Sequence, residues 1–433
     1  MWKVFIQNFG CRATQADGAA LEGLLEKQGY QSSDAARTAD LVILNTCTVT
    51  SSADDDVRKS IHRVHRENPE AQILVTGCYA QRAPEELSRI PCVTWVVGNS
   101  HKTGIPEFLA APYHGQILVG DISEATGFLS SPVDDAFGDR TRPNLKIQEG
   151  CNNPCTFCII PTVRGRSRSM PLSQVLGEIS ALAGSYREVV LTGINLGRWG
   201  REAGFQPERR MRLSDLLAVI LQETAVERLR ISSVEPMDFT DDLLDVMAGS
   251  RRVARHIHAP LQSGSDAVLK RMKRRYRSRH YEDRLMRAFG LLPDAAFGAD
   301  VMTGFPGETD AEFQETYDFI QRLPLTYLHV FTYSSRPGTT AADATDHVPH
   351  PARKERTRLL RDLAAQKNLE FRRRMVGRTL SAVTLDNGKA LTENYLNVEM
   401  AVPRAANQLV DLRIGGVTAA GLSEAGALTV LAS

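Results

Sequence analysis

The chain has 433 residues, of which 42% are hydrophobic and 24% charged, and its formal net charge is +1. This composition is typical of a globular protein with material for more than one core, and it excludes a disordered or fibrous chain. The first residues lack the apolar segment and cleavage site of a secretory signal, and the chain has no run of about 18 apolar residues, so we expect a cytoplasmic protein without membrane contact.

The N-terminal residues 1–112 alternate short apolar runs with amphipathic stretches, which is typical of a parallel α/β sheet. We expect strands at 3–7, 41–45, 72–76 and 94–97, with helices near 14–28 and 52–67. The pattern predicts a doubly wound α/β domain. Residues 113–136 are rich in Pro, Gly, Ser and Asp and are predicted to form a linker.

A second run of alternating strands and helices follows within residues 137–368, with strands expected at 145–148, 188–191, 228–232, 256–261, 299–302 and 328–332. Six βα units are too few for a closed eight-stranded barrel, so we predict an open (βα)6 partial TIM barrel. A long basic helix is expected at 351–375. Residues 369–433 then predict a small antiparallel β-barrel, with strands at 379–385, 396–400, 408–414 and 427–431.

The most specific motif is a C-x3-C-x2-C triplet formed by Cys151, Cys155 and Cys158, directly after a predicted strand. Three closely spaced thiolates can hold one face of a cubane iron–sulfur cluster and leave the fourth iron without a protein ligand. Such an iron could bind S-adenosylmethionine (SAM). Structural zinc is the alternative, but zinc needs four ligands, and the nearest following histidine is His256.

The other cysteines are far apart in the sequence. Cys11, Cys47 and Cys78 each come just after a predicted parallel strand, and the ends of such strands meet at one edge of the sheet, where ligands bind. They therefore predict a second three-cysteine cluster, although each cysteine alone would be read as a small core residue. Cys92 has no such partners and is predicted to be a core residue.

At these residues the sequence resembles the methylthiotransferase branch of the radical SAM superfamily, and in particular the bacterial threonylcarbamoyladenosine tRNA methylthiotransferases. The resemblance covers almost the whole chain. It rests on segments that are individually weak but specific in this order: NFGC, NTCTV, TGCYAQ, GCNNPCTFCIIP, RGRSRS, LTGINLG, SSVEP, PLQSGS, GFPGET and ENYLNV.

The resemblance implies that Cys151, Cys155 and Cys158 bind the [4Fe–4S] cluster that cleaves SAM, and that Cys11, Cys47 and Cys78 bind an auxiliary [4Fe–4S] cluster. It also implies that the C-terminal barrel is an RNA-binding TRAM domain. The implied reaction adds a methylthio group to C2 of N6-threonylcarbamoyladenosine next to the tRNA anticodon, at position 37, with an electron donor such as flavodoxin or ferredoxin.

Contacts to SAM are expected at the strand ends of the partial barrel, where catalytic groups of βα folds gather. The candidates follow the second to fifth strands of this region and are Gly193, Asn195, Glu235, Gln262, Ser263 and Gly304. Each could instead be a simple turn or capping residue.

Three basic segments could bind the phosphates of the tRNA anticodon stem-loop: 270–279, 372–374, and the arginines Arg164, Arg166 and Arg168. Tyr395 is predicted either to stack on a base or to lie in the barrel core. Three alternatives stay open at this point: action on isopentenyladenosine in tRNA, action on a ribosomal protein, and a noncatalytic metal-containing RNA-binding protein.

Overall fold

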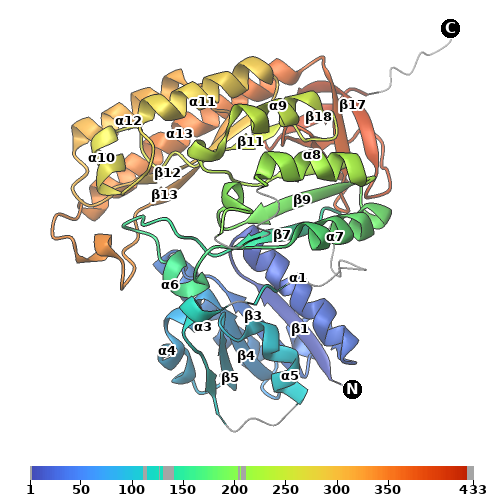
Figure 1. The fold of residues 1–433 in the computed structure, drawn as a ribbon, viewed down its shortest axis with the longest axis vertical. Helices are drawn as coiled ribbons and strands as arrows, with labels where there is room; N and C mark the ends of the chain where they lie inside the picture. The colour runs from blue at the N-terminus through green and yellow to red at the C-terminus, as the bar shows by residue number, and fades with distance from the viewer. Residues whose placement is uncertain are drawn as a thin grey trace.

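A computed structural model describes residues 2–110, 115–125, 127–129, 141–202, 205 and 211–426. The N-terminal part forms a six-stranded, all-parallel sheet in the order β2-β1-β3-β4-β5-β6 (Figure 1). Its strands are β1 (Lys3–Asn8), β2 (Gln31–Ser32), β3 (Leu41–Thr46), β4 (Gln72–Gly77), β5 (Trp95–Gly98) and β6 (Ile117–Leu118). β6 lies inside the predicted linker and extends the sheet.

The two main helices of this part cover opposite faces of its sheet. Side chains alternate along β3, so that Leu41 and Ile43 pack in one cluster with Leu21 of α1 (Arg12–Lys27). Val42 and Leu44 pack on the other face with α2 (Ser51–Glu67). Because successive side chains point to opposite faces and both faces are covered by helices, the strand is a continuous apolar run. This arrangement is the predicted doubly wound domain.

The central part carries six parallel strands surrounded by helices. The strands are β7 (Asn144–Glu149), β9 (Glu188–Gly193), β10 (Arg228–Ile231), β11 (His256–His258), β12 (Ala296–Thr303) and β13 (Tyr327–Thr332). The surrounding helices are α7 (Leu172–Ser185), α8 (Leu213–Glu223), α9 (Asp241–Gly249), α11 (Ser278–Leu291), α12 (Asp310–Arg322) and α13 (His350–Met375). The result is the predicted open (βα)6 partial barrel.

The hydrogen-bond ladder of this barrel is interrupted at one point. β7, β9 and β10 form one sheet with the short antiparallel β8 (Arg168–Ser169), and β11, β12 and β13 form another. The amides of Leu229 and Ala254 bridge the two, because Leu229 N donates to Arg252 O at 2.7 Å and Ala254 N donates to Leu229 O at 2.9 Å. The strands therefore follow one curved surface from β7 to β13.

The inner face of this surface is polar. Val189 and Leu191 of β9 belong to the large apolar cluster under the helices, whereas Glu188 and Thr192 on the same strand are buried polar residues. Glu188 is paired with Arg230 of β10 at 2.8 Å, with both side chains fully buried. A polar interior suits a barrel that holds cofactors and a polar substrate better than one that is only a core.

The C-terminal part is a closed five-stranded barrel in the order β14-β15-β16-β18-β17. Its strands are β14 (Thr379–Thr384), β15 (Lys389–Thr392), β16 (Asn397–Glu399), β17 (Leu409–Val417) and β18 (Leu422–Glu424). The short β15 and β18 are absent from the sequence-based prediction, and the strand predicted at 427–431 lies outside the described residues. The predicted small barrel is confirmed.

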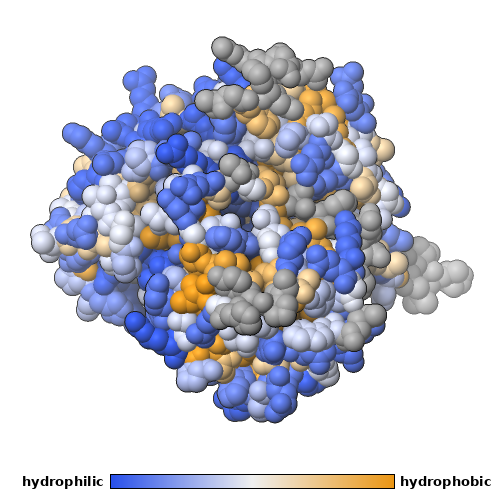
Figure 2. All heavy atoms as spheres, turned by 60° about the horizontal axis from the view of Figure 1, so that its bottom comes forward, coloured by the Kyte–Doolittle hydropathy of each residue, from blue (hydrophilic) through white to orange (hydrophobic). Residues whose placement is uncertain are grey.

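No helix among the described residues is long and apolar enough to cross a membrane. Figure 2 turns the lower side of Figure 1 toward the viewer, and hydrophilic residues cover most of this face around a smaller hydrophobic area.

Candidate functional site

Three cysteines meet at the carboxyl edge of the N-terminal sheet. Cys11 precedes α1, Cys47 follows β3, and Cys78 begins the short α3 (Cys78–Arg82) directly after β4. Because β3 lies between β1 and β4, the three thiols share one edge. Gly10 has φ +99°, and a Cβ placed on it would lie 2.6 Å from Cys47 Cβ, so only glycine allows the first loop to approach so closely.

The trio of Cys11, Cys47 and Cys78 suits a positively charged metal centre that binds thiolate sulfur. Burial, together with the neighbouring Cys78, raises the pKa of the Cys47 thiol to about 12. Thiols with such a pKa stay protonated unless a metal supplies positive charge, and sulfur is the ligand that iron–sulfur clusters use. All three are free thiols. The donor set therefore fits an iron–sulfur cluster.

The second trio lies on the loop after β7. Cys158 N donates to Cys155 O at 3.2 Å, which folds the loop back on itself, and Asn153 N points at Cys151 Sγ at 3.4 Å. Burial raises the pKa of Cys158 to about 12, with Cys155 and Cys151 adding to the effect. These three sulfurs form a second donor set of the same kind, as their spacing predicts.

Arg164 of α6 (Ile160–Arg164) links the two trios. Its Nε donates to Cys78 Sγ at 3.3 Å, and its Nη1 donates to Glu149 Oε1 at 2.9 Å, two residues before Cys151. Cys78 also packs in a small buried cluster with Ile159 and Val163. The two cysteine trios are thus brought together across the interface between the N-terminal sheet and the barrel.

A network of buried charges surrounds this link. Asp17 of α1 accepts hydrogen bonds from Lys102, Lys146 and Arg164. Burial alone would raise the pKa of Asp17, but these three cations outweigh it and hold the pKa well below its ordinary value. The network therefore stays ionised and fixes α1 against β7.

The structure places the predicted SAM contacts in two groups. Asn195 Nδ2 donates to Cys151 Sγ at 3.5 Å, and Glu235 is ion-paired with Arg274, whose Nη1 donates to Cys155 Sγ at 3.3 Å. Cys155, Glu235 and Arg274 line one hollow. Asn195 and Glu235 are thereby brought to the cysteine loop.

Gly193 packs closely on Gln148 of β7, where an added Cβ would lie 2.9 Å from Gln148 Cβ. Gln262 has φ +66°, and its backbone N donates to the backbone O of Asp300 at 2.8 Å. The other two candidates contact the helices behind the strands. Ser263 Oγ lies 2.9 Å from Thr316 Oγ1 of α12, and Gly304 packs against Arg353 of α13.

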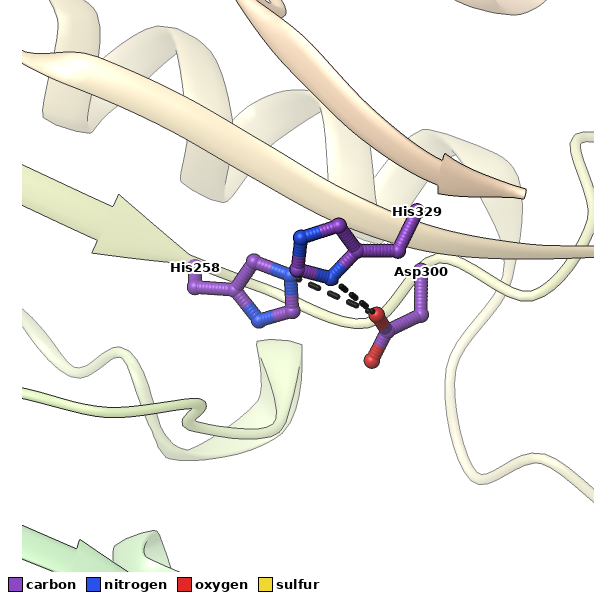
Figure 3. Close-up of side chains that lie close together, drawn as sticks. All are labelled: His258, Asp300 and His329. Carbon is purple, nitrogen blue, oxygen red and sulfur yellow. Dashed lines mark hydrogen bonds and ion pairs between the residues drawn. The ribbon is translucent and has the colours of Figure 1, made fainter. Parts of the chain in front are cut away.

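The inner wall of the barrel carries a histidine–aspartate–histidine group that sequence reasoning missed. His258, Asp300 and His329 come from the neighbouring strands β11, β12 and β13, and both rings turn toward one carboxylate (Figure 3). His329 Nδ1 lies 3.2 Å and His258 Nε2 lies 3.4 Å from Asp300 Oδ1. The group could bind a cation or hydrogen-bond a substrate.

Two of the arginines predicted to bind phosphate are buried inside the protein and bind other side chains. Arg164 is buried in the charge network, and Arg274 is buried beside Cys155, so the prediction of phosphate contacts is wrong for both. A basic run gives no sign of which side chain points inward. The exposed cations of the same segments remain available to RNA; they are Arg166, Lys270, Lys273, Arg275, Arg277, Arg279, Arg373 and Arg374.

Comparison with known proteins agrees with this geometry. The model of the Radical SAM superfamily matches residues 145–320, and that of the uncharacterized protein family UPF0004 matches residues 3–98. The partial barrel with its cysteine loop thus defines a radical SAM enzyme, a class that uses SAM and a [4Fe–4S] cluster.

The sequence is 35% identical, over 95% of this chain and 100% of the relative, to threonylcarbamoyladenosine tRNA methylthiotransferase MtaB of Aquifex aeolicus. It is 38% identical to MtaB of Bacillus subtilis, over 92% of this chain and 90% of the relative. It is 33% identical to tRNA-2-methylthio-N(6)-dimethylallyladenosine synthase of Carboxydothermus hydrogenoformans, over 86% of each chain. The chain belongs to the radical SAM methylthiotransferase family.

Solved structures share the fold at low sequence identity. The radical SAM methyltransferase TsrM of Kitasatospora setae, with tryptophan substrate and a SAM analog bound, matches with a TM-score of 0.55 and 15% identity, over 76% of this chain and 73% of that chain. This similarity supports the fold alone.

Proposed function

We propose that this chain adds a methylthio group to C2 of N6-threonylcarbamoyladenosine in tRNA, at position 37 next to the anticodon. The observation that carries the proposal is the contact of Arg164, on the segment that follows the second cysteine trio, with Cys78 of the first trio, because the reaction needs a sulfur source and a SAM-cleaving centre in one place. The name of the Aquifex aeolicus relative, which matches over its whole length, supports this choice of substrate.

In this proposal Cys151, Cys155 and Cys158 hold the [4Fe–4S] cluster that binds SAM, while the trio of Cys11, Cys47 and Cys78 holds the auxiliary cluster. When bound, the first cluster supplies the electron that cleaves SAM. Three protein ligands per cluster leave one iron free, which a closed four-cysteine site would not do.

The protein positions and shields these centres. Asn195 and Arg274 donate hydrogen bonds to the sulfurs of Cys151 and Cys155, which holds the cysteine loop in position. Arg274 in turn orients Glu235 toward the same hollow, where Glu235 can contact SAM. The buried charge network around Asp17 holds the N-terminal sheet domain against the partial barrel.

Binding of the anticodon stem-loop would use the exposed cations of 270–279 together with Arg166 and the C-terminal barrel. Arg372 serves the fold instead, because its Nη1 donates to Thr418 O at 2.9 Å. The electron would come from a small redox protein such as flavodoxin or ferredoxin.

The test is an anaerobic reaction of the reconstituted chain with SAM, dithionite and a synthetic anticodon stem-loop that carries N6-threonylcarbamoyladenosine. Nucleoside mass spectrometry should detect the methylthio product. A matched stem-loop with isopentenyladenosine tests the second candidate substrate, which the 33% identical relative from Carboxydothermus hydrogenoformans favours. Product from the isopentenyl RNA alone would refute the proposed substrate, and product from neither RNA would refute action on tRNA.

A further inference from the structure

Arg12 extends from the auxiliary trio to the place where the C-terminal barrel meets the partial barrel. It follows Cys11 directly and is the first residue of α1, but its Nη2 donates to the hydroxyl of Tyr395 in the C-terminal barrel at 3.0 Å. Its guanidinium lies 5.8 Å from the centre of the Tyr395 ring. The side chain therefore joins the segment of an expected cluster ligand to the C-terminal barrel.

Among the described residues, Arg12 differs from three buried arginines of this region because it has no counterion. Arg164, Arg230 and Arg274 each lie within 4.0 Å of a carboxylate oxygen. Among the described residues no carboxylate lies so close to Arg12, and its Nη1, although shielded from solvent, has no hydrogen-bond partner. A shielded cation without a counterion destabilises the folded chain unless a bound anion completes the site.

The wall next to Arg12 is built from aromatic and imidazole rings. The Tyr395 ring lies 4.5 Å from His256 and 5.7 Å from Tyr327, and Tyr327 lies 5.4 Å from His329. These rings connect Arg12 to the histidine–aspartate–histidine group shown in Figure 3. The wall offers planar surfaces for stacking and N–H donors for hydrogen bonds, which suits a nucleoside.

This group does not neutralise Arg12. Burial would raise the pKa of Asp300, but the neighbouring His258 and His329 hold it below its ordinary value, so the carboxylate is paired within its own group. His258 Nδ1 is occupied by Ser233 Oγ at 2.7 Å, while its buried Nε2 lacks a hydrogen bond of good geometry. His329 is half exposed, so its ring can meet a ligand.

We propose that Arg12 binds the carboxylate of the N6 substituent of the target adenosine, with His329 as a second contact to that substituent. This inference rests on the proposed function. In adenine, C2 and C6 are separated only by N1, so an adenosine whose C2 faces the auxiliary trio brings its N6 substituent close to the residue after Cys11. The threonylcarbamoyl group ends in a carboxylate, which pairs with a guanidinium, whereas an isopentenyl group is neutral and would leave Arg12 without a counterion.

The experiment measures binding of fluorescent anticodon stem-loops to the reconstituted chain by anisotropy. Three RNAs differ only at the target nucleoside: N6-threonylcarbamoyladenosine, its methyl ester, and unmodified adenosine. The wild-type chain should prefer the free acid. Arg12→Gln should raise the Kd of the acid RNA about 10- to 100-fold and leave the other two nearly unchanged, because one charge-assisted contact is lost. Arg12→Lys should keep part of the preference.

A matched control is Arg66→Gln, which removes an exposed arginine of α2 and should leave all three Kd values unchanged. Equal weakening of all three RNAs by Arg12→Gln, or an unchanged preference for the acid, would overturn the inference. So would a change only in the electron paramagnetic resonance spectrum of the auxiliary cluster, since Arg12 would then serve the cluster and not the substrate.

Failure of the proposed function has a different signature. If the wild-type chain converts the acid RNA to its methylthio product while Arg12→Gln keeps the preference, only the inference about Arg12 fails. If the wild-type chain neither prefers nor converts the acid RNA, the proposed substrate fails and the inference falls with it.

Discussion

Arg164 Nε lies 3.3 Å from Cys78 Sγ, although the arginine belongs to the barrel and the cysteine to the N-terminal sheet. The same guanidinium binds Asp17 of the sheet domain and Glu149 of the barrel. One side chain thereby ties together two units that are distant in sequence, directly beside the sulfur of a predicted cluster ligand. Hydrogen bonds to sulfur are among the protein features that set the potential of an iron–sulfur cluster.

Replacing Arg164 by glutamine should destabilise the chain strongly, because two buried carboxylates lose a shared partner. Loss of one member of a buried ion pair costs about 3–5 kcal/mol, which corresponds to a fall in Tm of about 4 °C for a chain of this length. Calorimetry of the reconstituted chain measures this fall. Arg164→Lys keeps the charge, so its Tm should lie between those of the wild type and Arg164→Gln. A glutamine variant with the Tm of the wild type would refute the structural role.

The six predicted cluster ligands should separate into two functions. Cys155→Ala should abolish SAM cleavage, whereas Cys11→Ala should leave cleavage intact and stop methylthiolation. Each variant should lose about half of the bound iron, since each trio holds one of two clusters. Cys92→Ala is the matched control, because Cys92 packs against the apolar core of the N-terminal sheet and should keep the full iron content. Equal loss of both activities in the first two variants would argue against separate roles.

Glu188 predicts a specific acid sensitivity. Burial would raise its pKa, but Arg230 and its neighbours lower it to about 2 from an ordinary value of 4.5. Because the folded pKa is depressed, the stabilisation is complete above pH 4.5 and is lost as the pH falls toward 2, a total of about 3 kcal/mol. Urea unfolding of the cofactor-free wild type and of Glu188→Gln should therefore differ most at neutral pH and converge in acid. A difference that is constant with pH would contradict this assignment.

The exposed and buried arginines of the basic run should behave differently. The double variant Lys273→Gln, Arg275→Gln should weaken binding of every tRNA alike and reduce the slope of log Kd against log salt by about 0.7–0.9 per lost phosphate contact. Arg274→Gln should instead lower Tm and SAM cleavage, because Arg274 is buried between Glu235 and Cys155. Filter binding over a salt series and a melting curve separate the two effects. A salt slope that the double variant leaves unchanged would remove this run from the RNA interface.

Much of the fold could be predicted from the sequence because its strands are buried on alternating faces. The runs at 41–45 and 72–76 leave little freedom in register, and both strands lie within a residue of the expected positions. β18 (Leu422–Glu424) could not be predicted, because a three-residue strand carries too little periodicity to be distinguished from a turn.

The site was predictable where the chemistry is local in sequence or follows from topology. The triplet at 151–158 has a diagnostic spacing, and Cys11, Cys47 and Cys78 share one position at the ends of parallel strands. The histidine–aspartate–histidine group has neither signal, because its members lie on three strands and meet only after the barrel curves. The burial of Arg164 was equally invisible, since its partners Asp17 and Glu149 are set by the packing of one domain on another.

Tyr395, held at φ +64° in the turn between β15 and β16, contacts Arg12 of α1 and the rings of His256 and Tyr327 in the partial barrel. The C-terminal barrel is therefore packed against the other two parts of the chain and is not an independent module. Replacement of this module by an unrelated one would leave Arg12 without its hydroxyl acceptor and would remove the ring that packs on His256 and Tyr327. The side of the C-terminal barrel that carries Tyr395 therefore has to evolve together with the N-terminal domain and the partial barrel.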